Sequence, residues 1–463
     1  STWPTPLPCT SYLLAMLCSS PFPPLFFTLL VVACAVAVSI VDYGAVPGDP
    51  SHEAAEANSN ALRHSFLHAN SSSTDRTVVV PSGKFFYYNV SLDRVHDIVF
   101  RIEGQLVASN NISAEVWKHV EATMEFSNST NLEITGSGMV DGQGYRWWWE
   151  VILTAKDFRP HLLLVDRSSH VLIHSLFFQN SPMFHLLLRD SSHVVVRNVD
   201  IHVDVSAQKS LLEKHGYWMT KHPVTGLPLG GLFGGIPTFP LNTDGIDPSG
   251  SDYLIENCTI ENFDDAVAVK PTNGGDINPC SQDMLIRNVH VKYSVGLTIG
   301  SVPPHVQTNC VRNITFEACT MTNAIKGIYV KSNPGDEGSG IIDQISYRNI
   351  SIHRALWMPI WIGPQQQKQP GTTGTGCSFF YPISKTCPTD PRVRMSRIVL
   401  EDLVLDRGLL MPGVVLCDPT TPCTAFRFTN VTNSGPFFLS KHYVCKNAFG
   451  LSHTSTPAIP FQA

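Results

Sequence analysis

The chain has 463 residues, of which 43% are hydrophobic and 15% charged, and its formal net charge at pH 7 is −6. That length is enough for one large domain or for several ordinary ones. The small negative charge, without any block of basic residues, argues against nucleic acid as the main partner. Glycine, proline and β-branched residues are plentiful, which predicts many short strands joined by turns.

The N-terminal part of the chain differs from the rest. Residues 25–38 form an apolar run that is too short to cross a membrane comfortably but is typical of a signal-peptide core. We therefore expect residues 1–37 to be a removed leader, and residues 38–463 to form the mature, secreted domain. A membrane anchor is the competing interpretation, because no positively charged segment precedes the apolar run.

Cysteines and glycosylation sequons also favour secretion. Nine of the twelve cysteines follow the expected leader, and their spacings do not resemble a zinc site. An oxidising compartment would let most of them pair, and the odd number leaves at least one unpaired. The shortest spacings predict local disulfides between Cys377 and Cys387 and between Cys417 and Cys423. Eight N-x-S/T sequons fit a glycosylated protein: Asn70, Asn89, Asn111, Asn128, Asn257, Asn313, Asn349 and Asn430.

A short pattern recurs from residue 170 onward, in which an apolar run precedes Asn and alternating apolar residues follow it. Examples are "YLIENCTI", "MLIRNVHV", "NCVRNITF" and "ISYRNISI", with their Asn at positions 257, 288, 313 and 349. One such unit cannot bury its apolar face alone, whereas stacked units can. We predict an all-β fold, a single-stranded, right-handed parallel β-helix with coils of about 22 to 25 residues. A β-sandwich or a propeller is the alternative.

Two further segments fit a solenoid. Residues 51–69 predict an amphipathic helix with Leu62 and Phe66 on one face, which would cap the open apolar end of the first coil. Residues 206–240 form a long excursion rich in Gly and Pro, of the kind that often borders a binding site. Residues 365–463 match no functional motif and are assigned to the final coils and a tail.

Acidic residues gather after this excursion, in "NTDGID" with Asp244 and Asp247 and in "NFDD" with Asp264 and Asp265. Like charges at short range raise one another's pKa, so that one carboxyl group keeps its proton near neutral pH. Glycoside hydrolysis needs that asymmetry, with one acid to protonate the leaving oxygen and one base to activate water. Asp244 and Asp264 are separated by about one coil, which would place them on adjacent rungs about 4.8 Å apart.

The adjacent aspartates impose a condition on the fold. In a regular strand Asp264 and Asp265 would point to opposite faces of the sheet. Both can face one cleft only if the backbone turns or bulges between them, so we expect an irregularity at this point.

These motifs resemble those of the polygalacturonases, family 28 of the glycoside hydrolases. That family carries N-T-D, D-D, G-H-G and R-I-K in this order on successive coils. "NTDG" (242–245) and "FDD" (263–265) match the first two, "SVGLTIGS" (294–301) aligns with the third and "GIYVKS" (327–332) with the fourth. The resemblance extends over residues 40 to 360.

The sequence departs from the family pattern at three places. Val295 stands where the family has its histidine, and Tyr329 stands where it has an arginine that would bind a galacturonate carboxylate together with Lys331. A family cysteine pair is replaced by Ala266 and, near its second position, Val291. A lysine alone lacks the bidentate fork of arginine, which puts recognition of a uronate in question.

The resemblance implies specific roles for the matching residues. Asp264 would be the general acid, and Asp244 and Asp265 would hold the attacking water, as in inverting enzymes with an acid–base gap of about 6.5–9.5 Å. Lys331 would contact a substrate carboxylate or hydroxyl group. Neither a metal ion nor another cofactor is expected. The candidate substrate-binding residues are Asn242, Lys270, Tyr329 and Lys331. Asn242 would bind a sugar or orient Asp264, unless it only forms an Asx turn, and Tyr329 would either stack on a sugar or pack at a coil surface.

We therefore expect a secreted, monomeric, inverting glycoside hydrolase that cleaves pectin-type polysaccharide and makes no stable membrane contact. One alternative is a hydrolase of a related chain such as rhamnogalacturonan. Two others are a β-elimination lyase and a non-catalytic carbohydrate-binding β-helix.

Overall fold

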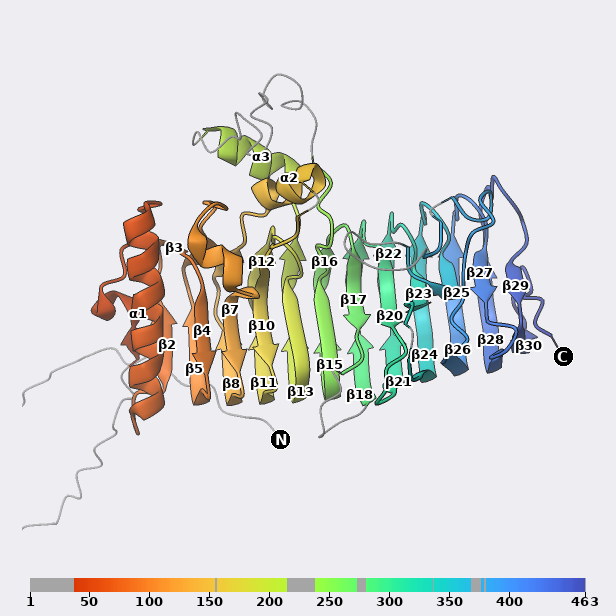
Figure 1. The fold of residues 1–463 in the computed structure, drawn as a ribbon, viewed down its shortest axis with the longest axis horizontal. Coiled ribbons are helices and arrows are strands. Elements are labelled where there is room, and N and C mark those ends of the chain that lie inside the picture. The colour runs from red at the N-terminus through yellow and green to blue at the C-terminus, as the bar shows by residue number, and fades with distance from the viewer. Residues whose placement is uncertain are drawn as a thin grey trace, which may run out of the picture.

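The computed structural model describes residues 37–154, 156–214, 238–272, 280–335, 337–367, 376–378 and 380–462. Within them, 30 strands are linked by parallel pairing into one solenoid that runs from the N-terminal to the C-terminal end of the fold (Figure 1). The predicted leader, residues 1–37, lies outside the described residues except for its last position. No helix in the described ranges is both long and apolar enough to cross a lipid bilayer.

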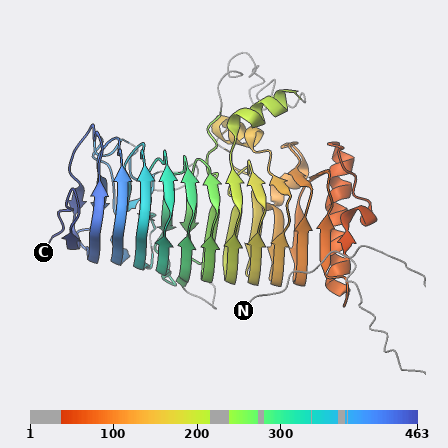
Figure 2. The same cartoon turned by 180° about the vertical axis from the view of Figure 1, so that it is seen from behind.

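The strands form three stacks, as their pairing shows, and the successive coils lie side by side in Figure 2. The first stack consists of β1 (Val38–Ser39), β2 (Thr77–Val80), β5 (His96–Ile102), β8 (Thr130–Thr135), β11 (Ser169–His174), β13 (Leu186–Arg197), β15 (Ile246–Glu256), β18 (Cys280–Arg287), β21 (Asn309–Glu317), β24 (Gly340–His353), β26 (Val393–Asp406), β28 (Cys423–Asn433) and β30 (Ala448–His453). The second consists of β3 (Lys84–Tyr87), β6 (Gln105–Ala108), β9 (Met139–Asp141), β12 (Phe177–Gln179), β14 (Asp200–His202), β16 (Thr259–Glu261), β19 (His290–Lys292), β22 (Thr320–Thr322) and the C-terminal part of β24. The third consists of β4 (Val90–Asp93), β7 (Ala122–Ser127), β10 (His161–Asp166), the first residues of β13 and β15, β17 (Asp265–Val269), β20 (Gly296–Val302), β23 (Ile328–Ser332), β25 (Ile360–Gln365), β27 (Gly413–Leu416) and β29 (Val444–Lys446).

Apolar side chains of successive coils form ladders inside the solenoid. In the third stack Val267, Leu297, Ile328 and Ile360 occupy one row of register partners, and all four are fully buried. Burying one such side chain contributes about 1.5–3 kcal/mol to the stability of the folded protein. Full burial requires a neighbouring coil on each side. The structure confirms the right-handed parallel β-helix and rules out the sandwich and the propeller.

Asparagines line one corner of the coils. The sequence pattern also assigned Asn313 to this corner, and this assignment was wrong. Asn257 and Asn288 both have left-handed backbone conformations, and Asn288 Nδ2 donates a hydrogen bond to Asn257 Oδ1 (3.3 Å). These two residues are 31 positions apart, longer than the predicted coil. Asn313 does not continue this column: it lies at an earlier corner, where its side chain donates to Asp283, and Ala318 takes the place of Asn in the column.

The N-terminal helix covers the first coil as predicted. Helix α1 (His52–Ser71) begins after Ser51, whose hydroxyl group accepts a hydrogen bond from the N–H of Ala54 (3.2 Å). Leu62 and Phe66 are buried against the coil, and the Phe66 ring packs edge-on against Phe100. The short 3-10 helices η1 (Ile40–Tyr43) and η2 (Glu115–His119) complete this end. In Figure 1, α1 stands beside β2 at the N-terminal end of the solenoid.

Two more helices project from one side of the coils. Helices α2 (Tyr145–Thr154) and α3 (Val205–Lys214) lie together above the strands in Figures 1 and 2. Helix α3 forms the start of the predicted excursion, and residues 215–237 of that excursion lie outside the described residues. Trp148 and Trp149 of α2 pack in one apolar cluster with Val203, and Phe263 lies against this cluster. The helices therefore border the segment that carries Asp264.

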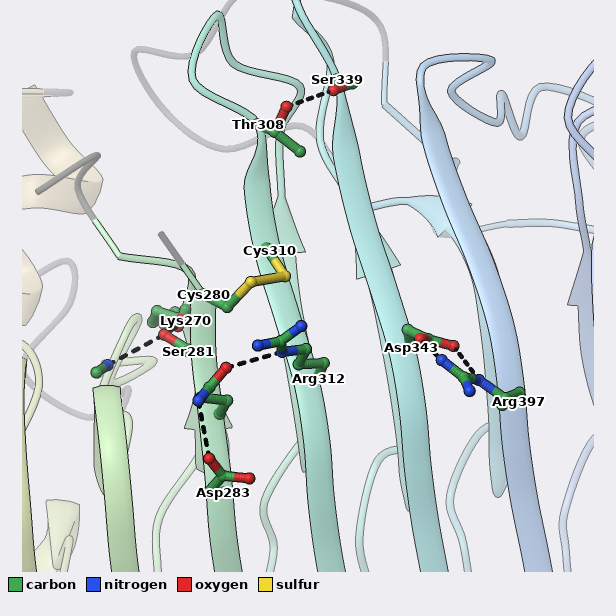
Figure 3. The surroundings of a disulfide bond; sticks show 12 residues. Lys270, Cys280, Ser281, Asp283, Thr308, Cys310, Arg312, Ser339, Asp343 and Arg397 are labelled. Atoms are coloured by element: carbon green, nitrogen blue, oxygen red, sulfur yellow. Dashed lines mark hydrogen bonds and ion pairs between the residues drawn. A yellow bond between two sulfur atoms is a disulfide. The ribbon is translucent and has the colours of Figure 1, made fainter. Parts of the chain in front are cut away.

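The described residues confirm both predicted disulfides and add a third. The pairs are Cys377–Cys387, Cys417–Cys423 and Cys280–Cys310. The third joins direct register partners on β18 and β21 (Figure 3). The cysteines of the described part that form no disulfide are Cys258, Cys319 and Cys445.

Candidate active site

Two neighbouring coils bring the acidic motifs together at the start of the third-stack strands. Asp244 precedes β15 by two residues, Asp264 immediately precedes β17, and Asp265 is the first residue of β17. The strands pair through Ile246 and Val267, so the two motifs lie on adjacent rungs. Carboxylate oxygens of the three aspartates lie within 4.8 Å of one another. The predicted convergence is confirmed.

The backbone turns at the expected place. Asp264 lies in a bend just before β17, outside the regular strand that begins at Asp265, so the alternation of a strand does not apply to the two carboxyl groups. A register shift of β17 against β20 follows, between Asp265 and Val267. On the neighbouring rung the N–H of Gly245 donates to the carbonyl group of Asp265 (2.9 Å). Glycine is required at this position because a Cβ would lie 2.4 Å from the carbonyl oxygen of Ala266.

Asp265 is the aspartate that the protein keeps ionised. Its Oδ2 lies 2.7 Å from the ammonium group of Lys331, and its Oδ1 accepts a hydrogen bond from the Thr298 hydroxyl group (2.7 Å). Burial alone would raise the pKa of Asp265, but the charges of Lys331 and Lys270 and these hydrogen bonds lower it below its usual value.

Asp264 has no ion pair within the described residues, and it is the only partly exposed member of the three. Its oxygens accept hydrogen bonds from the backbone N–H groups of Asn242 (3.2 Å) and Asp265 (3.0 Å). Its carbonyl group is held by Val295 N–H and by the Ser294 hydroxyl. Burial, followed by the charge of Asp265, raises its pKa. Asp264 is therefore suited to keep a proton.

Asp244 is buried and faces a second carboxylate that we did not include among the site residues. Burial raises the pKa of Asp244 well above its usual value, and the charges of Asp247 and Asp264 add to this effect. Lys270 Nζ lies 3.7 Å from Asp244 Oδ2 and 3.3 Å from Asp247 Oδ2. Burial also raises the pKa of Asp247, whereas the charge of Lys270 and a hydrogen bond from it lower it. The Lys270 side chain is 25% exposed, so it is the cation of this group that solvent and ligand can reach.

Three polar residues that the sequence analysis did not select hold these motifs in place. Asn262 is fully buried and donates to the carbonyl groups of both Thr243 and Asp265 (each 2.8 Å). His185 Nδ1 lies 2.9 Å from the carbonyl oxygen of Asp244, while its Nε2 accepts from Ser181 N–H. Burial lowers the pKa of His185 to about 4, so its ring is neutral at pH 7. Arg159 donates to the side-chain oxygen of Asn242 (2.9 Å).

Asn242 acts on the acid through its backbone. It has a left-handed conformation (φ 58°), and its side-chain oxygen is engaged by Arg159. Its N–H points to Asp264, which supports the orienting role more than direct sugar binding.

Tyr329 does not offer a sugar-stacking surface, contrary to one predicted role. It is 2% exposed, and its hydroxyl group donates to Gln367 Oε1 (2.9 Å). Lys326 Nζ lies 3.5 Å from the centre of the Tyr329 ring and 3.3 Å from the same Gln367 oxygen. Burial lowers the pKa of Lys326 well below its usual value. Tyr329 thus belongs to an aromatic wall with Trp357 and Trp361.

Val295, in the place of the family histidine, packs against this aromatic wall. Lys331 is bound to Asp265 with a side chain only 8% exposed, so a substrate contact by this lysine stays a prediction. The three aspartates supply oxygen atoms close enough to ligate one hard cation. The ammonium group of Lys331 already neutralises Asp265, and the protein thereby supplies positive charge itself.

The spacing of the carboxylates suits a bound water molecule. A water that donates hydrogen bonds of about 2.75 Å to two carboxylates holds their oxygens about 4.5 Å apart. The observed limit of 4.8 Å agrees with this, although it is shorter than the gap that we expected for an inverting pair.

Comparisons with known proteins agree with the motifs. Residues 71–455 match the sequence profile of the glycosyl hydrolases family 28. The chain belongs to this family. It is therefore a glycosidase, as the acidic motifs predicted.

Individual relatives are distant. A polygalacturonase of Chamaecyparis obtusa is 23% identical over 411 residues, which cover 86% of this chain and 67% of the relative. A probable rhamnogalacturonase E of Aspergillus flavus is 24% identical over 385 residues, 81% of this chain and 68% of the relative. The fold is similar to that of the endo-xylogalacturonan hydrolase of Aspergillus tubingensis, with a TM-score of 0.67 at 19% identity over 91% of this chain and 99% of the other.

Proposed function

We propose that the protein is a secreted, monomeric, inverting glycoside hydrolase that cleaves pectin-type polysaccharide. The observation that carries this proposal is the cluster of three aspartates within 4.8 Å, in which Asp265 is paired with Lys331, Asp244 lies near Lys270 and Asp264 has no ion pair within the described residues. One proton and two negative charges on such a cluster provide the acid and the base that glycosidic cleavage needs.

In the proposed mechanism Asp264 protonates the leaving oxygen, because it is the partly exposed member of the three and no cation pairs with it in the described residues. The pKa of Asp244 is raised well above its usual value, so the active form is the one in which Asp244 has lost its proton. Asp265 and Asp244, both ionised in the active form, hold the water between them. Asp265 takes the proton of this water as it attacks the anomeric carbon from the face opposite the leaving group. Lys331 keeps Asp265 ionised, and Asn242 orients Asp264. Lys270 is the proposed contact for a substrate carboxylate or hydroxyl group.

The residues at the aromatic wall support a second candidate substrate, a related pectic chain. The position that would carry the arginine for a galacturonate carboxylate is taken by buried Tyr329, whose partner is Gln367. This favours a chain in which the sugar next to the aromatic wall is neutral, such as rhamnogalacturonan, and one relative carries the name rhamnogalacturonase.

The test is an assay of the purified protein on homogalacturonan, rhamnogalacturonan, xylogalacturonan and a neutral polysaccharide. A hydrolase releases reducing ends without ultraviolet absorbance, whereas a lyase product absorbs because it contains a double bond. Proton NMR of the first products shows inversion or retention at the anomeric carbon. Release of no product from any pectic chain would leave a carbohydrate-binding β-helix as the better description.

Secretion rests on three disulfides and the eight sequons. Expression in a secreting eukaryotic cell should deliver the protein to the medium, with a mass that falls on treatment with an endoglycosidase. Retention in the membrane fraction would favour the anchor.

A further inference from the structure

Asp247 lies among the acids of the site, but the mechanism proposed above gives it no role. Its side chain is 0% exposed, and its ion pair within the described residues is with Lys270, at 3.3 Å. A buried carboxylate without a partner costs several kcal/mol, so Asp247 and Lys270 depend on one another.

The backbone of Lys270 is fixed on both sides. Its N–H donates to the carbonyl group of Pro248 (3.0 Å), and its own carbonyl group accepts from the Ser281 hydroxyl (2.6 Å). Ser281 follows Cys280, which is tied to the next coil by its disulfide (Figure 3). The freedom that Lys270 retains is therefore in its side chain. Its ammonium group lies between Asp244 and Asp247 and 5.3 Å from the centre of the Phe184 ring.

We propose that Asp247 is a positioning residue: as the counter-ion of Lys270, it keeps the ammonium group from closing onto Asp244. The Lys270 nitrogen lies nearer to Asp247 (3.3 Å) than to Asp244 (3.7 Å), a distance too long for a hydrogen bond. Asp244 thereby keeps an oxygen available for the water. This inference rests on the proposed function.

Other charged groups face the same carboxylates and would be unchanged by a substitution at position 247. Asp264 and Asp265 lie on the next rung, and Lys331 lies on β23. His185, on the preceding coil, contacts the Asp244 carbonyl group as a neutral ring. A change in the titration of Asp244 on substitution of Asp247 therefore reports the Asp247–Lys270 pair.

Two variants should shift the acidic limb of the pH profile of kcat/KM in opposite directions. In Asp247→Asn a negative neighbour is lost and Lys270 moves onto Asp244, and both changes favour the ionised form, so the limb moves down by about one pH unit. In Lys270→Met the cation is lost, so the limb moves up. Asp252→Asn, a half-exposed position on the same strand, should leave the profile unchanged.

Crystal structures of both variants provide a readout that needs no activity. In Asp247→Asn the distance from Lys270 Nζ to the nearest Asp244 oxygen should shorten from 3.7 Å into hydrogen-bonding range. An unchanged distance, or shifts of both variants in one direction, would overturn the inference. A wild-type protein that cleaves no polysaccharide would instead overturn the proposed function, and the distance would still decide the role of Asp247.

Discussion

The ammonium group of Lys331 lies 2.7 Å from Asp265 Oδ2, and the two side chains are 8% and 1% exposed. Charges at this depth are poorly screened by solvent, so each depends on the other for compensation. The pair also bridges coils, because Asp265 begins β17 and Lys331 lies on β23, two coils further along.

Lys331→Met should therefore destabilise the protein by about 3–5 kcal/mol near pH 7, because it leaves Asp265 buried without its main partner. The folded-state pKa of Asp265 is lowered, so the pair contributes fully above about pH 4 and its contribution is lost as the pH falls through the folded pKa. Urea unfolding of wild type and variant should show a difference that shrinks below pH 4. Lys292→Met, which removes a half-exposed partner of Glu261, is the control and should cost less than about 1 kcal/mol.

Asp264→Asn should abolish hydrolysis while the protein still folds. General acid catalysis contributes about 10²- to 10⁴-fold, and an amide cannot donate the proton that the leaving oxygen needs. Release of reducing ends measures the loss, and thermal unfolding verifies the fold. Activity within about tenfold of wild type would exclude Asp264 as the acid.

Lys326→Met should stabilise the protein at neutral pH or leave its stability unchanged. Burial lowers the folded-state pKa of Lys326, so the unfolded chain binds the proton more tightly than the folded protein does. Wild-type stability should accordingly rise with pH between the folded pKa and the usual lysine value, whereas the variant lacks this gain. Chemical unfolding at pH 7 and pH 9 tests the prediction, which fails if the variant is less stable at both pH values by the same amount.

Removal of Cys280–Cys310 should destabilise more than removal of Cys417–Cys423. The first closes a loop with a sequence separation of 30 and the second one of 6. Chain entropy predicts losses of about 3–4 and about 2 kcal/mol for the corresponding double Cys→Ser variants. Unfolding midpoints in urea give the comparison. Cys445→Ser, at a cysteine outside any disulfide, serves as the control.

Sequence reasoning located the fold and the three converging aspartates because both rest on local patterns. Asp264 and Asp265 could share a face only if the backbone turned between them, and the bend that contains Asp264 supplies this turn. The coil phase was harder, because Asn313 sits in an "RNI" context like the true corner residues while its strand continues for four more residues. That error also hid the Cys280–Cys310 pairing, since the two cysteines are opposite one another only in the correct register.

The surroundings of the motifs could not be predicted in the same way. Tyr329 was found by alignment, but its burial depends on Gln367 and on aromatic residues a coil or more away. Lys326 carries no spacing signal, and Asp247 was grouped with the acidic residues but given no role. Only the packing of neighbouring coils shows that Lys326 is enclosed by rings and that Asp247 faces Lys270.

Helix α1 has a consequence for how molecules of this protein meet one another. A coil without a neighbour presents unpaired backbone groups along a strand, and such an edge recruits strands of other chains. Here α1 lies over the first coil, and β1 pairs with β2. A shortened chain that began after Ser71 would expose β2 and the Phe100 ring together, and we expect it to join end to end into filaments that the intact protein avoids.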